Sequence, residues 1–292
     1  MIILSYLLYY LVIMPISLLP FRVLYILSDG LFLLFYYIVG YRKKVVMKNI
    51  KNSFPEKTTL EQNEICRGFY KHFCDLIVES LKIFTVSNKE VNKRMVFKNP
   101  EFIQRYFENK QSIIMAGGHL NNWELFAVAI DEAIGHQAIG IYQPLTNQFF
   151  DKKMRDTRSK YGLRMISTKS VKKVLDEEKD KITAMIFASD QSPSNPNNCY
   201  WTKFLNQDTG VLFGVEKYAK EYNYPVVYGR INKEKRGYYS YEFFEVCDNP
   251  SKTSYGEITE KFTSMLEKDI IESPAFWLWS HKRWKHARPQ GK

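Results

Sequence analysis

A histidine and a glutamate five positions apart follow a predicted strand and open a predicted helix. The stretch GGHLNNWE, residues 117–124, comes directly after the apolar run 112–116. A histidine at a helix start faces partial positive charge, which favours the neutral imidazole and therefore a proton acceptor. A nearby carboxylate would hold the tautomer of that ring and stabilise the imidazolium once a proton is taken. The pattern therefore predicts His119 as a general base and Glu124 as the acid that orients it.

The same stretch also has a purely structural interpretation. Asn121 followed by Glu124 resembles a capping box, in which the glutamate closes the start of a helix. The two glycines would then serve a tight turn. That interpretation gives His119 no task, and the residues of this stretch leave both interpretations open.

A second polar group follows another predicted strand. The apolar run 182–188 leads into Ser189, Asp190 and Gln191. In open α/β sheets, ligands bind outside the carboxyl ends of the strands, so we expect Asp190 and His119 on one rim of the sheet. The alternative is structural, because an aspartate in the stretch SDQSPSNP suits an Asx turn or a helix N-cap.

The spacing of apolar residues predicts the elements that position these groups. Residues 60–88 have apolar side chains three and four apart, which indicates an amphipathic helix. Strands then alternate with helices, which predicts an α/β fold with a mixed, mostly parallel sheet flanked by helices. The predicted strands are 112–116, 137–142, 182–188, 225–231 and 238–246. The predicted helices are 122–133, 147–160, 170–179, 210–221 and 258–271.

The N-terminus is predicted to form a hydrophobic, membrane-associating helix. Residues 1–21 contain no charged side chain, and roughly 20 apolar residues let a helix cross the hydrocarbon layer. A second apolar run, 31–39, precedes Arg42, Lys43, Lys44 and Lys48, a basic cluster that places the remainder of the chain in the cytoplasm. Prolines within the first run leave open a helix that lies in the interface, and a buried core hairpin is the other alternative.

The composition favours an anionic or apolar partner. The 292 residues carry a formal net charge of +11, and 15% of them are aromatic. The charge favours nucleic acid, acidic lipid headgroups or an acidic protein, and the aromatic content suits a membrane interface. The four cysteines form no zinc pattern and are predicted to be reduced thiols of a cytoplasmic protein. The other histidines have no useful partner spacing, so we expect no metal site.

Basic and aromatic residues alternate at the end of the chain. The ending HKRWKHARPQGK contains no acidic residue. Such a cluster suits phosphorylated lipid at a headgroup interface as well as nucleic acid. No basic reading helix or known nucleic-acid module accompanies it, so nucleic acid is not an expected partner. Together with the apolar N-terminus, the ending predicts a phosphate or headgroup contact by Arg283, with a solvated tail as the alternative.

The order of these features along the chain resembles that of the lipid A biosynthesis (lauroyl/myristoyl) acyltransferases, which belong to the lysophospholipid acyltransferase superfamily. His119 and Glu124 match the HX4D/E motif of that superfamily, and the resemblance extends over nearly the whole chain. It implies a hydrophobic membrane-anchoring segment, 1–41, and an acyltransferase catalytic domain, 42–292. Further matching stretches are Gly40-Tyr41-Arg42 with Asn49, Ser53-Phe54-Pro55, Tyr142-Gln143-Pro144, Asp190-Gln191 and residues 277–285, WLWSHKRWK.

The resemblance implies transfer of a fatty acyl chain from an acyl carrier protein thioester to a hydroxyl of a lipid A precursor. The reaction would take place at the cytoplasmic face of the bacterial inner membrane. His119 would take the proton of the attacking hydroxyl while Glu124 orients the ring. No cofactor, metal or covalent acyl-enzyme is implied.

The resemblance also implies roles for two further residues. Arg158 corresponds to an arginine near the site, and its planar fork would bind an acceptor phosphate. A solvated basic helix face is the alternative, with Arg155 as the neighbouring candidate. Asp190 corresponds to an acid expected to orient Arg158 or the loop. Many relatives carry another acid two positions further on, where this chain has Ser192.

Other functions stay open on the sequence. The motif describes the chemistry and not the acceptor, so an aminolipid or a lysophospholipid is a compatible acceptor. A membrane-tethered binding protein with an inactive site is the alternative outside enzymes. A hydrolase is disfavoured because the chain has no GxSxG elbow.

Overall fold

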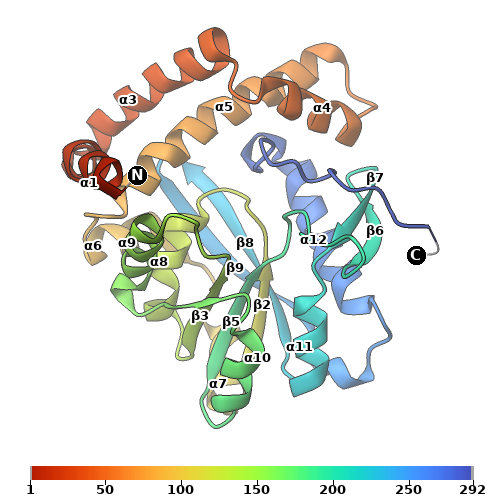
Figure 1. The fold of residues 1–292 in the computed structure, drawn as a ribbon. Helices are drawn as coiled ribbons and strands as arrows, with labels where there is room; N and C mark the ends of the chain where they lie inside the picture. The colour runs from red at the N-terminus through yellow and green to blue at the C-terminus, as the bar shows by residue number, and fades with distance from the viewer. Residues whose placement is uncertain (1, 291–292) are drawn as a thin grey trace.

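Seven strands form one mixed sheet at the centre of the molecule (Figure 1). The structure is a computed structural model that describes residues 2–290. Every neighbouring pair of strands is parallel except the last hairpin, β8–β9, so the predicted mixed, mostly parallel sheet is confirmed. In the order of the sheet the strands are β1 (Met95–Phe97), β9 (Tyr238–Cys247), β8 (Val226–Lys235), β2 (Ile113–Gly117), β5 (Thr183–Ala188), β3 (Gln137–Tyr142) and β4 (Arg164–Ser167).

Helices cover both faces of this sheet (Figure 1). Side chains alternate along a strand, and β2 shows this directly. Ile114 and Ala116 belong to one buried cluster, while Ile113 and Met115 belong to the other. The helices are α4 (Lys43–Ser53), α5 (Thr59–Lys82), α6 (Asn88–Arg94), α7 (Glu101–Glu108), α8 (Trp123–Ala133), α9 (Gln148–Arg158), α10 (Val171–Glu177), α11 (Gly214–Tyr222) and α12 (Glu257–Glu272), with 3-10 turns η3 (Ser159–Tyr161), η4 (Pro250–Lys252) and η5 (Pro274–Phe276).

The pairing of β2 with β5 brings two distant segments to one edge of the sheet. Gly117 pairs with Ala188, and the N–H of Ser189 donates to the carbonyl of Gly117 at 3.0 Å. The segments that follow β2 and β5 therefore leave the sheet in register and side by side. His119 and Asp190 each come two residues after this last pair, as expected for residues at the carboxyl ends of neighbouring parallel strands.

A hairpin with a two-residue turn was not predicted. β6 (Tyr200–Phe204) and β7 (Gln207–Val211) pair antiparallel, so the helix predicted over 210–221 is wrong at its start and α11 begins at Gly214. Leu205 and Asn206 join the strands with φ values of 50° and 63°. Left-handed φ at both positions is typical of a type I′ hairpin turn, which usually contains glycine. The sequence Leu-Asn lacks that signal.

The helix predicted over 60–88 is shorter in the structure. α5 ends at Lys82, and α6 begins at Asn88, capped by Ser87. At the start of α5 a capping box does form, because the Thr58 hydroxyl and the Glu61 carboxylate bond reciprocally to backbone N–H groups. The short strands β1 and β4 were also missing from the prediction.

The apolar N-terminus forms two helical segments and not one. α1 (Ile2–Leu8), η1 (Tyr9–Ile13) and α2 (Met14–Leu18) follow one another without a break, and extended backbone at Leu19 and Pro20 then ends the first segment. α3 (Phe21–Leu33) continues as η2 (Leu34–Val39), and these 19 residues are long and apolar enough to cross a membrane. Met1 in the anchoring segment and Lys292 in the basic ending lie outside the described residues.

The apolar side chains of the N-terminal segments lie on the outside of the molecule. Ile3 is 77% exposed, Ile26 70% and Ile38 77%. The alternative of a buried core hairpin is therefore wrong. Exposed apolar surface of this extent marks a membrane or protein contact, so an N-terminal membrane-associating helix is confirmed as a candidate. It is 21–39 and not the run 1–21, because the helix of that run ends at Leu18.

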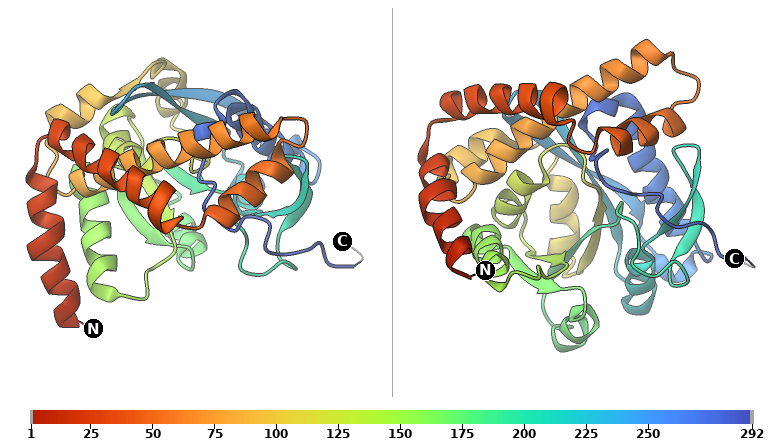
Figure 2. Two further views of the ribbon diagram at one scale, coloured as in Figure 1. Left: turned by 90° about the horizontal axis from the view of Figure 1, so that it is seen from above. Right: turned by 45° about the horizontal axis from the view of Figure 1, so that its top comes forward.

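The inner side of α3 buries Leu24 and Phe32 together with the polar Ser28, and it packs on α5, which runs alongside it (Figure 2). The hydroxyl of Ser28 donates to Asp75 Oδ1 at 2.7 Å. The ammonium of Lys82 donates to the carbonyls of Ser17 and Leu19 at 2.9 and 3.0 Å, where the helical bonding is interrupted. α3 therefore rests on the body of the protein with exposed apolar side chains facing outwards.

All four cysteines are free thiols, as predicted. Cys66 and Cys74 are fully buried on α5, and burial raises the pKa of Cys66 to about 11. A buried thiol with a raised pKa is a poor nucleophile, which is typical of a packing role.

Gly118 is the residue where β2 gives way to the turn, and we predict that Gly118→Ala destabilises the fold. A Cβ at this position would lie 2.7 Å from Leu266 Cδ2 and 3.0 Å from Asp190 Oδ2. Overpacking of a filled site costs about 1–3 kcal/mol. Gly117→Ala is the matched control, because its Cβ would meet nothing closer than the Gly229 carbonyl at 3.6 Å. Urea unfolding of both variants tests this, and equal stabilities would contradict it.

Candidate active site

His119 is held by the carboxylate of Asp190 at the carboxyl edge of the sheet. Its Nδ1 lies 2.6 Å from Asp190 Oδ1, and its backbone N–H donates to Asp190 Oδ2 at 2.7 Å. The indole Nε1 of Trp277 donates to the same Oδ2 at 2.8 Å. Because an ionised carboxylate only accepts, we assign the imidazole proton to Nδ1. The lone pair of His119 is therefore on Nε2.

The second ring nitrogen of His119, Nε2, contacts Gln191 and belongs to a partly exposed side chain. The His119 side chain is 18% exposed, whereas that of Asp190 is 2% exposed. His119 Nε2 lies 3.2 Å from the amide nitrogen of Gln191, which is able to donate to it. Trp123 packs edge-on against the ring, with 5.0 Å between the ring centroids. This arrangement presents an oriented proton acceptor to the surroundings.

The histidine and the aspartate shift each other's ionisation. Burial disfavours the charged imidazole, but the Asp190 carboxylate outweighs burial and raises the pKa of His119 above its ordinary value. Burial likewise disfavours the carboxylate, but His119 and the N–H donors outweigh it and lower the pKa of Asp190 to about 2. A buried carboxylate that stays ionised is suited to stabilise an imidazolium.

The acid that orients His119 is therefore Asp190, and the predicted contact with Glu124 is wrong. The carboxylate of Glu124 accepts two bonds from Arg158 instead, from Nε at 2.8 Å and from Nη2 at 2.5 Å. Asp190 correspondingly does not orient Arg158. The physical reason is that α8 directs Glu124 towards the last residue of α9, while the β2–β5 register brings Asp190 to the ring.

The Glu124–Arg158 pair lies mostly out of solvent. Its side chains are 11% and 23% exposed, and the two parallel bonds form the bidentate geometry that guanidinium and carboxylate prefer. Burial lowers the pKa of Arg158, but Glu124 outweighs this and raises it. Arg158 therefore does not belong to a solvated basic face, whereas its neighbour Arg155 is exposed.

The capping-box interpretation of the turn is also wrong. Asn122 caps α8, because its Oδ1 accepts the N–H of Leu125 at 2.8 Å. Asn121 has a left-handed φ of 58°, and its amide donates to the carbonyl of Ile231 at 2.7 Å. Glu124 thus has no capping task.

Arg283 lies inside the protein and not at a headgroup surface, so its predicted contact is not formed. It is 2% exposed, and its Nη1 donates to the carbonyl of Gly210 at 2.7 Å, while its buried Nε has no partner among the described residues. Burial lowers the pKa of Arg283 to about 10, and the Asp190 carboxylate partly offsets that effect. The solvated-tail alternative therefore fails for Arg283, whereas Lys282, Lys285 and Arg288 of the same ending are exposed.

One indole and one imidazole near the His119–Asp190 pair were not predicted. Trp277 binds Asp190 directly, and a backbone bridge between Leu120 and Trp277 holds the C-terminal segment against the turn. Burial lowers the pKa of His281 to about 4, although the Asp190 charge opposes this. The stretch WLWSHKRW contains both Trp277 and His281. It was noted only as part of the family resemblance, because residues so far from His119 in sequence give no sign that they lie near it.

Among residues 2–290, no group of three or more His, Cys, Asp or Glu side chains is arranged to hold a metal ion. Within that range the nitrogens of the His119 ring contact Asp190 and Gln191 and no serine or cysteine. The geometry supports activation of a hydroxyl that comes from a substrate.

The fold and the site define an α/β protein with a histidine–carboxylate pair on the carboxyl rim of a mixed sheet. The profile of a family described as bacterial lipid A biosynthesis acyltransferase matches residues 1–286. The chain belongs to this family, which confirms the resemblance found in the sequence.

The chain is also similar to individual members of known activity. It is 22% identical to the lipid A biosynthesis lauroyltransferase of Escherichia coli (strain K12) over 276 residues, which cover 94% of this chain and 88% of that protein. It is 19% identical to the lipid A biosynthesis palmitoleoyltransferase of the same strain over 251 residues, which cover 86% of this chain and 80% of that protein.

We predict that Asp190→Asn lowers the pKa of His119. The carboxylate raises that pKa against burial, so its neutralisation leaves burial to lower it. Glu124→Gln should lower it less, because Glu124 acts on the ring by charge alone. NMR titration of the ring in the folded variants measures both shifts. A His119 pKa that does not change in Asp190→Asn would contradict the assigned pairing.

Proposed function

We propose that this protein transfers a fatty acyl chain from an acyl carrier protein thioester to a hydroxyl of a lipid A precursor. The observation that carries the proposal is the contact of His119 Nδ1 with the carboxylate of Asp190, in a chain of the lipid A biosynthesis acyltransferase family. The names of the similar lauroyl- and palmitoleoyltransferases support lipid A chemistry.

In the proposed reaction His119 Nε2 takes the proton of the acceptor hydroxyl while the hydroxyl oxygen attacks the thioester carbonyl. A carbon–oxygen bond forms and the carbonyl electrons move to its oxygen. The tetrahedral oxyanion then collapses, the carbon–sulfur bond breaks, and the imidazolium returns its proton to the thiolate. Asp190 stabilises the imidazolium between the two proton transfers.

Arg158 is proposed to bind negative charge during the reaction. Its two bonds to Glu124 leave three of its five N–H groups for a phosphate of the acceptor or for the oxyanion. In this proposal Glu124 acts through Arg158, because it holds the guanidinium plane in place. Loss of one donor to a developing oxyanion typically costs about 3 kcal/mol of barrier.

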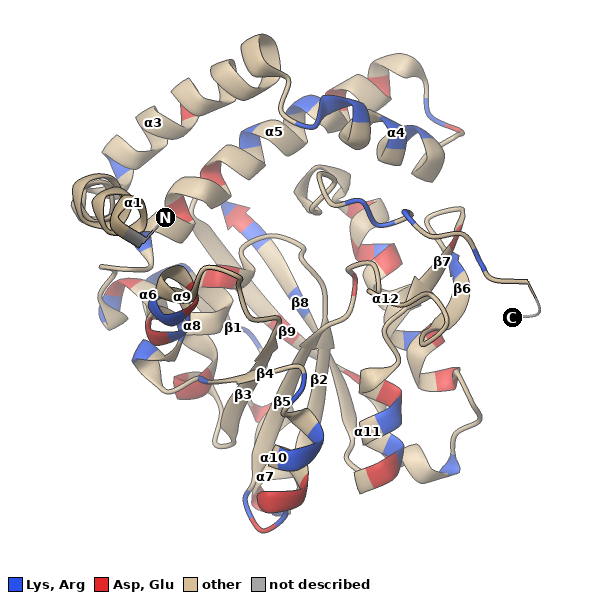
Figure 3. Cartoon of the chain, in the orientation of Figure 1, with Lys and Arg blue, Asp and Glu red and all other residues tan. Residues whose placement is uncertain are grey.

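The reaction is proposed to take place at the cytoplasmic face of the inner membrane. The exposed apolar side of 21–39 supports membrane association. α4, which follows this helix, carries exposed lysines, and the basic C-terminal segment lies beside α4 (Figure 3). Asn49 holds these two segments together by donating to the carbonyls of Trp279 and His281, both at 2.9 Å. Positive charge next to apolar surface suits anionic lipids. An acidic donor protein would be attracted by the same lysines.

We predict that His119→Ala abolishes acyl transfer without unfolding the protein. The full chain would be incubated with acyl carrier protein thioester and a tetra-acylated lipid A precursor, and the product followed by mass spectrometry. The wild type should add the mass of one acyl chain. His136→Gln is the control, because His136 precedes β3 at the opposite edge of the sheet. No mass gain by the wild type would overturn the proposal. Acylation of a different lipid instead would show that the acceptor is not a lipid A precursor.

We predict that Arg158→Lys lowers kcat strongly, because an ammonium cannot reproduce the bidentate bond to Glu124 and the remaining donors at once. A loss of roughly 10²-fold corresponds to about 3 kcal/mol of barrier. Arg155→Lys is the matched control on the same helix, since Arg155 is exposed. Equal rates for both variants would show that Arg158 takes no part in the reaction.

A further inference from the structure

A buried carboxylate on α5 contacts the turn that follows His119. Glu79 is 4% exposed. Its Oε2 accepts the side-chain amide of Asn122 at 2.6 Å and the hydroxyl of Tyr239 at 2.8 Å. Its Oε1 accepts the hydroxyl of Tyr25 at 2.9 Å. One side chain thus joins α3, β9 and the turn before α8, although no sequence motif connects these segments.

Asn122 transmits this contact to the helix. Its Nδ2 donates to Glu79 while its Oδ1 accepts the N–H of Leu125 in the first turn of α8. The two atoms belong to one planar amide, so a group that fixes the nitrogen also fixes the direction of the oxygen. The orientation of the cap, and with it the first turn of α8, therefore depends on Glu79.

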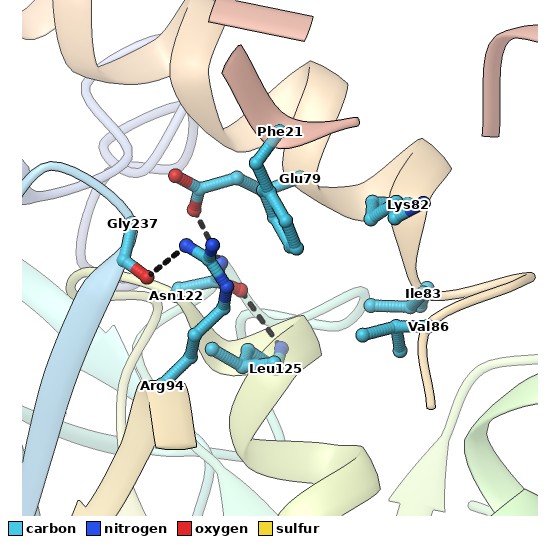
Figure 4. Close-up of a pocket in the computed structure, with 9 residues that line it drawn as sticks. All are labelled: Phe21, Glu79, Lys82, Ile83, Val86, Arg94, Asn122, Leu125 and Gly237. Atoms are coloured by element: carbon cyan, nitrogen blue, oxygen red, sulfur yellow. Dashed lines mark hydrogen bonds between the residues drawn. The ribbon is translucent and has the colours of Figure 1, made fainter. Parts of the chain in front are cut away.

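The partners of Glu79 include one group that only donates, the side-chain NH2 of Asn122, whereas the hydroxyls of Tyr25 and Tyr239 are able to donate and to accept. Three neutral donors converge on two oxygens, and within the described residues no lysine or arginine forms an ion pair with this carboxylate. Arg94, which lines the same small cavity, donates instead to the carbonyl of Gly237 and to Glu90 (Figure 4). Burying a carboxylate without a cationic partner is costly. Leucine, of similar size, would leave the NH2 of Asn122 without this acceptor, whereas glutamine would keep it by donating its own NH2 to the hydroxyl of Tyr25.

The cavity beside Glu79 is too small for a substrate. Its lining includes Phe21, Arg94 and Asn122 (Figure 4), and it leaves about 10 Å³ for the centre of a water-sized sphere. That volume holds about one water molecule. The cluster is therefore not a binding site, and its chemistry must act through the residues that it holds.

We propose that Glu79 is a positioning residue, which through Asn122 holds the start of α8 and so sets the Glu124–Arg158 pair relative to His119. The inference rests on the proposed function. Glu124 is the second residue of α8, so a displaced first turn moves its carboxylate together with the guanidinium bonded to it. The same carboxylate binds Tyr25, so the position of α3 and the geometry of the site depend on one group.

The test compares Glu79→Leu with Ser28→Ala in the full chain. Glu79→Leu should lower kcat per folded molecule by roughly 10-fold or more, because small displacements of catalytic groups are costly, and should leave KM within about twofold. Asn122→Ala should have a similar effect, and the double variant should lose little more because both changes break one connection. Ser28→Ala removes another buried bond between α3 and α5, that of Ser28 to Asp75. It should lower stability and spare the rate per folded molecule.

A second measurement does not depend on activity. Hydrogen–deuterium exchange of the peptide 119–128 should be faster in Glu79→Leu than in the wild type and in Ser28→Ala, because the amide of Asn122 is no longer held and the N–H of Leu125 loses a fixed acceptor. Exchange equal to that of Ser28→Ala, or a rate per folded molecule equal to that of Ser28→Ala, would overturn the positioning role. If the wild type shows no acyl transfer, the proposed function fails, and exchange alone still decides whether Glu79 holds the turn.

Discussion

The bond between His119 Nδ1 and Asp190 Oδ1 is the contact on which the site depends, and the sheet creates it. Parallel pairing of β2 with β5 ends at Gly117 and Ala188, so the segments that follow these two strands leave the sheet together. The backbone N–H of His119 and the indole of Trp277 complete the environment of the carboxylate. Asp190 therefore stays ionised although it is buried, and the proton of the ring stays on the inner nitrogen. The outer nitrogen is free to act as a base.

Around this pair the protein uses carboxylates as acceptors for fixed donors. Glu124 accepts both arms of Arg158, and Glu79 accepts three neutral donors without a cation. Each buried carboxylate has a desolvation cost, which only well-aligned donors offset. Buried carboxylates therefore add little to the stability of the fold, but they hold the side chains that donate to them in one geometry. That property suits a site in which two ion pairs on different helices and strands must keep a constant separation.

The N-terminal helices expose apolar side chains outwards and join the body through polar contacts as well as buried apolar ones such as Leu24. Tyr25 and Ser28 bond to α5, while Ile26 and Ile38 are exposed. The helix 21–39 is therefore fixed to α5, and Glu79 of α5 contacts Asn122 in the turn that follows His119. A surface of this kind would bring the site to the level of the headgroups, where an acyl chain and a phosphorylated acceptor would both be found.

Much of the fold could be predicted from the sequence, because strand periodicity and helix spacing are local. The strands 137–142 and 182–188, the rim that carries His119 and Asp190, and the apolar N-terminus all followed from such patterns. Which acid meets His119 could not, because that depends on β2 lying beside β5, a pairing between segments about 70 residues apart. The hairpin turn at Leu205 lacks a glycine signal, and the burial of Arg283 depends on how the C-terminal segment packs. The sequence by itself determined which groups are available for chemistry; only the tertiary structure decided their partners, since hydrogen bonds join atoms that are close in space.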